Sequence, residues 1–116
     1  MSSHDPVGSS ICARFGAVPL PPAPESRLGI SAAARAGALP LHGLWHPPEG
    51  AANGWFIWSG DLSPDPDFFQ STCTSHVPTV LPAVLPYLAL PPGWRFLVAP
   101  GYEDVWFDPT LLTPAP

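Results

Sequence analysis

The sequence contains no lysine, and its only strongly basic side chains are four arginines. Nine carboxylates outnumber them, so the formal net charge at pH 7 is -5. A protein that binds nucleic acid needs cations to neutralise phosphates, and the scarcity of cations argues against that class of partner. An acidic surface instead favours basic partners, whose encounter it accelerates, although the same charge could serve solubility alone.

Long apolar runs and paired cysteines are also missing. Proline and glycine interrupt the apolar stretches well short of the roughly 20 residues that a membrane-spanning helix requires. The first residues have neither the basic segment nor the apolar core of a secretory signal. Cys12 and Cys73 lie far apart in the sequence and are predicted to be free thiols, as in a reducing compartment. We therefore expect a cytoplasmic protein without a membrane partner, with export by a signal-independent route left open.

Catalytic motifs are absent as well. No serine or cysteine stands in a nucleophile-elbow or Cys-His pattern, and there is no glycine-rich phosphate loop. Glu103 and Asp104 are neighbours, but adjacent strand residues point to opposite faces, so we do not expect them to share an acid-base site. Arg95 is instead expected to pair with Asp104 or Asp108. The sequence predicts a protein that is not an enzyme and uses no cofactor.

Two groups of residues have the composition of metal sites, but one lacks the helix that would align its ligands and the other lacks the full ligand pattern. His42 and His46 stand four residues apart, with His76 as a candidate third zinc ligand. Gly43 and Pro47 oppose the helix that would align the first two, so loop histidines are the favoured interpretation.

The loop at residues 60–69 suggests a calcium site because it carries three aspartates. Counted from Asp61, it lacks the glycine at position six and the glutamate at position twelve that close an EF-hand loop. Aspartate before proline is common in turns, where its carboxylate accepts backbone N–H groups. We therefore expect an acidic turn without a metal.

Aromatic residues are almost absent from the first third of the chain. Phe15 is the only one among residues 1–40, whereas the other twelve of the thirteen lie between Trp45 and Phe107. Because large rings provide most of the burial energy of a small core, we expect a single compact domain over residues 41–113.

Residues 1–40 are accordingly expected to form a disordered or loosely attached tail. Residues 18–24 have the composition of a polyproline-like spacer. Residues 31–38 favour at most a turn or two of helix, which Ser31 could cap. Residues 114–116 are the C-terminal end.

Strand signals recur after residue 40. Residues 41–46 alternate loosely and suggest an edge strand, and an Asn-Gly pair precedes a strong strand candidate at 55–59, which is a hairpin signal. A second hairpin is predicted for residues 94–107, where two strands rich in aromatic and β-branched residues flank a Pro-Gly turn.

Between these hairpins, residues 77–88 show helical periodicity that proline interrupts. Each proline in a helix interior costs about 3 kcal/mol, so Pro78, Pro82 and Pro86 exclude one straight helix. We expect two short helical pieces, the first capped by Ser75 and the second opened by Pro82. The sequence thus predicts an α+β fold in which a small antiparallel sheet of three to four strands packs against a short, proline-broken helical segment.

Both faces of the predicted strands carry large apolar groups. Trp55 and Ile57 point to one face of their strand, and Phe56 and Trp58 point to the other. One face must cover the core, and the other is either covered by helix and tail or exposed as a binding patch. For any single ring, core packing is favoured over a role in an interface.

Four segments resemble a known group of proteins. They are Gly-Trp-Phe-Ile-Trp-Ser-Gly at 54–60, Asp-Pro-Asp-Phe-Phe at 65–69, Val-Leu-Pro-Tyr-Leu at 84–88 and, most specifically, Pro-Gly-Trp-Arg-Phe-Leu-Val-Ala-Pro-Gly-Tyr-Glu-Asp-Val-Trp at 92–106. From about His42 to Leu112 the chain is similar to the Imm33-like group, small bacterial proteins related to the immunity proteins of polymorphic toxin systems. The resemblance implies that the protein binds and neutralises a cognate toxin inside the producing cell, by stoichiometric occlusion and without turnover.

If this function holds, the acidic loop and the second hairpin would steer and seat a basic toxin surface, with a tryptophan as a buried anchor. The residues predicted to meet the partner are Trp58, Asp61, Asp65, Asp67, Tyr102, Glu103, Asp104 and Trp106. The alternative is a small-ligand or regulatory module, or a structural interaction domain. A small-ligand module would need a ring-lined cavity of about 300 Å3 or more on the aromatic sheet face. The sequence leaves the oligomeric state open.

Overall fold

The computed structural model describes residues 9–48, 50, 52–65 and 67–112, and the predicted C-terminal end lies outside them. The strands are β1 (Arg27–Ser31), β2 (Leu41–Trp45), β3 (Ala52–Ser59), β4 (Phe69–Cys73), β5 (Trp94–Ala99) and β6 (Tyr102–Phe107). The helical segments are α1 (Ser9–Phe15), α2 (Ala32–Arg35), η1 (Thr74–His76), α3 (Val77–Val80), η2 (Pro82–Tyr87) and η3 (Pro109–Leu112). Among the described residues, no helix has the length and apolar character needed to cross a membrane.

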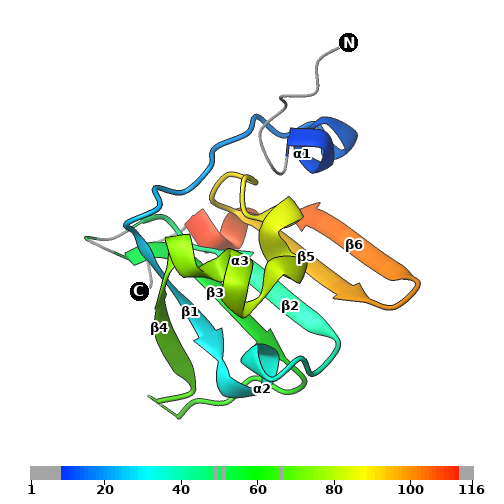
Figure 1. The fold of residues 1–116 in the computed structure, drawn as a ribbon. Coiled ribbons are helices and arrows are strands. Elements are labelled where there is room, and N and C mark those ends of the chain that lie inside the picture. Colours follow the sequence, from blue (N-terminus) through cyan, green and yellow to red (C-terminus); the bar gives the residue numbers. More distant parts are fainter. Residues whose placement is uncertain (1–8, 49, 51, 66, 113–116) are drawn as a thin grey trace.

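The strands form one mixed sheet in the order β4-β1-β3-β2-β5-β6 (Figure 1). β1 runs parallel to β3, and the other neighbouring strands are antiparallel. Helices α1 and α3 and the turn η2 lie on one side of this sheet (Figure 1). The prediction of a small antiparallel sheet of three to four strands is wrong, because the sheet has six strands and contains a parallel pair. Strands and helices together still give an α+β arrangement.

The first third of the chain supplies part of the sheet and of the core. β1 lies between β4 and β3, and its Leu28 and Ile30 are only 3% and 0% exposed. Helix α1 adds Ile11 and Cys12 to the same buried cluster. The predicted fold included a flexible N-terminal tail, and this prediction is wrong for the described part of the segment. Buried aliphatic side chains, rather than aromatic ones, hold this part against the rest of the domain. Residues 1–8 of the predicted tail lie outside the described residues.

The local helix signals are largely confirmed. Helix α2 is a single turn, and the Ser31 hydroxyl caps it by accepting a hydrogen bond from the Ala34 N–H at 3.2 Å. Helix α3 carries Pro78 in its first turn, and η2 begins at Pro82, as the proline spacing predicts. Ser75 was predicted to cap the first piece, but it lies inside η1 and no side chain caps either segment.

Both predicted hairpins are present, but one turn signal is misplaced. Strands β5 and β6 pair across the predicted Pro100-Gly101 turn. Strands β2 and β3 also pair, yet Asn53 and Gly54 lie inside β3 and not in the connecting turn. Gly54 has a φ of +97°, and a Cβ there would overlap the carbonyl oxygen of His46. Glycine is needed here for close approach between two strands.

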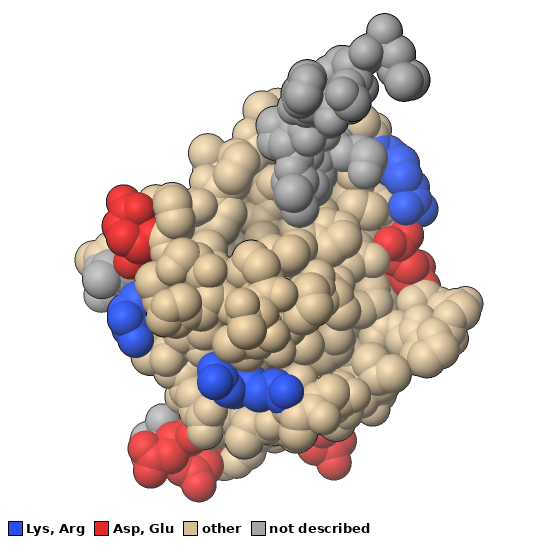
Figure 2. Space-filling view, in the orientation of Figure 1, with Lys and Arg blue, Asp and Glu red and all other residues tan. Residues whose placement is uncertain are grey.

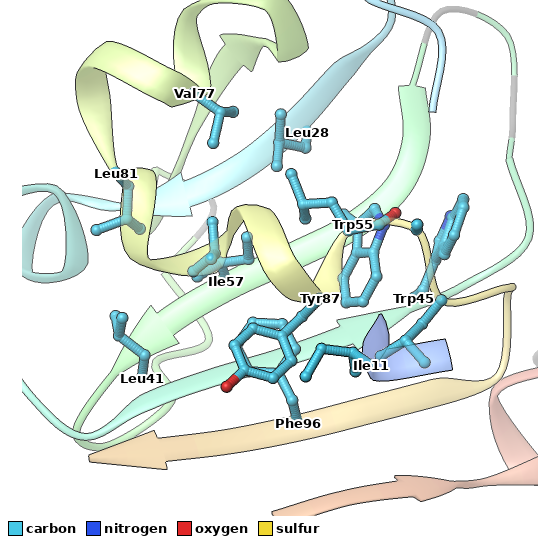
Figure 3. Packing of buried hydrophobic residues seen from close by; sticks show 14 of the residues in the cluster. Ile11, Leu28, Leu41, Trp45, Trp55, Ile57, Val77, Leu81, Tyr87 and Phe96 are labelled. Carbon is cyan, nitrogen blue, oxygen red and sulfur yellow. The ribbon is translucent and has the colours of Figure 1, made fainter. Parts of the chain in front are cut away.

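A stack of aromatic rings joins the helical layer to the sheet (Figure 3). Trp55 is fully buried, and its ring centroid lies 5.0 Å from that of Trp45 and 5.7 Å from that of Phe96. Tyr87 of η2 stacks on Phe96 with a centroid separation of 4.8 Å. Gly43 makes room for this ring, because a Cβ at that position would collide with the ring of Phe96.

The burial of β1 can be tested by truncating Ile30, which is 0% exposed, to alanine. We expect the free energy of unfolding to fall by about 2–5 kcal/mol, because the change leaves a cavity in the core. Leu20→Ala is the matched control, since Leu20 belongs to the same first third but is 50% exposed. Urea unfolding followed by tryptophan fluorescence measures both. An equally small effect of both substitutions on the free energy of unfolding would support the prediction that residues 1–40 form a loosely attached tail.

Candidate functional site

The sheet face opposite the helices carries a second group of large side chains. His42 lies beside Trp58 and Leu44 beside Phe56 across the β2–β3 pair. Phe69 of β4 reaches the same rings, with centroids 5.0 Å from Phe56 and 6.2 Å from Trp58. Because side chains alternate along a strand, these residues point away from the core. This set, called the aromatic face below, comprises His42, Leu44, His46, Phe56, Trp58 and Phe69.

A shallow hollow of about 220 Å3 lies on the aromatic face. It is lined by Leu44, His46, Phe56, Trp58, Leu62 and Phe69. Trp58 is only 5% exposed, and its ring stacks on His42 with centroids 5.1 Å apart and planes inclined by 6°. Leu62 is 57% exposed. Trp58 therefore forms a fixed wall of the hollow, whereas Leu62 forms an open lip.

The acidic loop lies between β3, which carries Trp58, and β4, which begins at Phe69; the structure describes its residues 60–65 and 67–68. Asp61, Asp65 and Asp67 are all exposed. The Asp65 carboxylate accepts a hydrogen bond from the Asp67 N–H at 2.8 Å, and the Ser63 hydroxyl accepts one from the Asp65 N–H at 3.1 Å. These are the bonds expected of aspartate in a turn. Within the part of the chain that the structure describes, no three His, Cys, Asp or Glu side chains converge on a metal position.

The carboxylate of Glu103, an exposed residue, is bound by two groups of the same chain on the helical side of the sheet. The Tyr87 hydroxyl donates a hydrogen bond to its carboxylate, and Arg14 of α1 lies 2.9 Å from it. The hydrogen bond from Tyr87, and then the hydrogen bond and charge of Arg14, lower the pKa of Glu103. Burial, helped by the Glu103 carboxylate, raises the pKa of Tyr87 to about 12. Asp104 is exposed and points to the opposite face.

Arg95 occupies the other half of the face that carries the hollow. Its guanidinium lies 3.2 Å from Asp108, so the predicted pairing with that carboxylate is confirmed, and 5.3 Å from the ring centroid of Trp106. Hydrogen bonds from Thr110, and then Arg95, lower the pKa of Asp108. Burial, and then the charge of Arg95, lower the pKa of His42, which keeps this imidazole neutral at pH 7.

The predicted partner-binding residues occupy several places. Trp58 lines the hollow, and the three aspartates lie in the loop that carries its lining residue Leu62. Trp106 lies under Arg95, and Tyr102 and Asp104 lie at the start of β6. The ends of β3 and β6 are separated by three strand spacings, or about 14 Å. Leu44, His46 and Phe56 were not among the predicted residues. The period-two alternation of β2 and β3 was the signal that could have placed them with Trp58.

These features define a small two-layer domain with one face closed by helices and a half-buried aromatic hollow on the other. The family model of the Imm33-like domain matches residues 8–108. The chain belongs to the Imm33-like domain family, as the resemblance of its aromatic and Asp-Pro segments suggested, and this membership implies a protein partner in general. No curated protein and no solved structure gives a significant match.

The internal role of Glu103 gives a test by titration. In Tyr87→Phe, the pKa of Glu103 should rise toward its ordinary value, because the hydroxyl that stabilises the carboxylate is removed. Since the folded-state pKa is lowered, the stabilisation by Glu103 is present above its ordinary pKa and is lost as the pH falls through the folded value. Carboxyl NMR titration measures the shift.

Arg14→Gln is the comparison for this titration and should also raise the pKa of Glu103, because it removes the charge of the second group that stabilises the carboxylate. Glu103→Gln should also flatten the loss of stability in acid. An unchanged Glu103 titration in Tyr87→Phe would show that this carboxylate faces solvent and is free to meet a partner.

Proposed function

We propose that this protein is an immunity protein that binds a cognate bacterial toxin in the cytoplasm of the producing cell and blocks it by stoichiometric occlusion. Membership in the Imm33-like family supports an immunity-type role. The observation that carries the proposal is the aromatic hollow bordered by the acidic loop. The protein acts by covering the toxin surface, without turnover.

The composition of this face is that of a protein interface. Stable interfaces combine a desolvated centre rich in aromatic residues with a polar rim. Here the centre is the aromatic face, and the rim carries Asp61, Asp65 and Asp67. Among the described residues, no arginine lies within ion-pair distance of these three carboxylates or of Asp104. Their charge is available to attract a basic toxin surface and to raise its association rate.

The helical side of the molecule offers less to a basic partner. Figure 2 shows that side, with acidic groups near the outline of the molecule and uncharged residues across the middle. The exposed positions of α3 and η2 include Pro78, Thr79, Pro82, Ala83 and Pro86. These side chains are small and uncharged, so they provide neither steering nor a large anchor.

The alternative of a small-ligand module has weaker support. Binding sites for small molecules are usually cavities of about 300–1,000 Å3 that enclose most of the ligand. The hollow on the aromatic face measures about 220 Å3 and is shallow. It suits one side chain of a larger partner better than a free metabolite.

The candidate toxin for the test is any secreted effector whose gene adjoins the gene of this protein. The purified pair should form a 1:1 complex, and co-expression should protect a cell from the toxin. In Asp61→Asn/Asp67→Asn, association should slow by about three- to tenfold at low salt and become less salt-dependent, because two steering charges are lost. Asp65 is kept because its carboxylate holds the loop turn.

Thr79→Lys/Ala83→Lys is the matched control for this measurement. It changes the net charge by the same two units, at exposed positions on the helical side. Stopped-flow association rates should be affected much less by this pair than by the loop pair. If both pairs of substitutions slow association equally, steering depends on the net charge alone and not on the acidic loop. If the toxin does not bind the unaltered protein at all, the proposed function is wrong.

A further inference from the structure

The hollow on the aromatic face has an apolar lining, and one of its lining residues, Leu62, belongs to the acidic loop. Its lining consists of aliphatic and aromatic side chains together with His46. Asp61 is adjacent in the chain to the lining residue Leu62, and Asp67 is two residues before the lining residue Phe69. Consecutive Cα atoms are about 3.8 Å apart, so the Cα atom of each aspartate lies within about 8 Å of the Cα atom of a lining residue. Such a site favours a ligand with an apolar body and a cationic end.

We propose that this hollow is a subsite for a single arginine side chain of the partner protein. The three methylene groups of arginine would lie along Leu44 and Leu62, and the guanidinium would reach the acidic loop. A guanidinium also stacks on aromatic rings, which Phe56 and Phe69 supply at the walls. The inference deepens the proposed function by naming the partner group that the aromatic face recognises.

Other occupants fit the site less well. A purely apolar side chain would leave the carboxylates of the acidic loop without a partner. A second copy of this chain would bring two such loops together, and like charges in apposition oppose association. A carboxylate or phosphate ligand is opposed by the three carboxylates of the acidic loop. Of the two arginines on this face by register, Arg95 is paired with Asp108, and Arg27 donates a hydrogen bond to the Ser71 hydroxyl. The charge of the rim therefore selects a cation.

Arginine also matches the hollow in size and shape. A volume of about 220 Å3 accommodates one long side chain but not a helix or a folded loop. Trp58 cannot swing out to enlarge it without losing the stack on His42 and the edge contact with Phe69. Interface hot spots are enriched in arginine and tend to occupy such preformed depressions. The hollow is thus a place where one partner residue could contribute much of the affinity.

The proposal can be tested without the toxin, using N-acetyl-arginine amide as the probe and N-acetyl-citrulline amide as its uncharged isostere. At low salt, the arginine probe should shift the Trp58 indole N–H and Leu62 methyl NMR signals and saturate in the millimolar range. Citrulline should need at least fivefold higher concentration. Asp61→Asn/Asp67→Asn should weaken the arginine probe about threefold or more without changing citrulline, while Thr79→Lys/Ala83→Lys should change neither probe strongly.

Equal affinity for both probes, or shifts confined to residues outside the hollow, would overturn the inference. Absence of binding by the arginine probe up to its solubility would do the same. These outcomes are separate from those for the proposed function. A toxin complex that forms normally while the probe fails removes only the arginine subsite, whereas probe binding without any toxin complex removes only the proposed function.

Discussion

The stack of Tyr87 on Phe96 joins the helical layer to the face of the sheet that it closes. Tyr87 belongs to the proline-broken helical layer, and Phe96 lies in the sheet next to the fully buried Trp55. Aromatic rings bury large apolar areas, so this stack fixes the helical layer against the sheet more firmly than the short helices could by themselves. The same tyrosine donates its hydroxyl to Glu103, which ties helix α1 to the edge strand through Arg14.

Closing one face of a sheet leaves the rings of the other face without a helical cover. Phe56 and Trp58 alternate with Trp55 and Ile57 along β3. Because Trp55 and Ile57 face the core, Phe56 and Trp58 must point to the second face. The chain partly shields them by stacking His42 on Trp58 and by folding the acidic loop beside them. The result is a hollow with Trp58 in one wall and the acidic loop beside it, which suits recognition of a protein surface more than chemistry on a small substrate.

Local chemistry in the sequence was sufficient for the helix breaks, for one helix cap and for the Pro100-Gly101 turn, but it misplaced the Asn53-Gly54 turn, which lies inside β3. Pro82 opens a helical turn because its missing N–H and fixed φ suit that position, and Ser31 caps α2 through its own hydroxyl. The position of β1 was not predictable in the same way. Its pairing with β3 and β4 depends on residues distant in the chain. Its buried side chains, Leu28 and Ile30, are aliphatic, so the scarcity of aromatic residues in the first third did not indicate that this segment is buried.

The candidate site was predicted in part for similar reasons. The Asp-Pro turn and the exposed carboxylates follow from residue type, whereas the distance between the acidic loop and β6 depends on strand order. The sequence predicted that Glu103 would meet a partner, yet its carboxylate is bound by Tyr87 and Arg14 of the same chain. Conversely, Leu44 and His46 line the hollow because β2 pairs with β3, and this pairing was not evident from residue type.

The most direct test of this account is hydrogen–deuterium exchange of the protein alone and in complex with its toxin. The account predicts that the toxin slows exchange in the acidic loop and in the adjoining residues of β2, β3 and β4, while α3 and η2 exchange as before. Protection confined to α3 and η2, with the acidic loop unchanged, would contradict it.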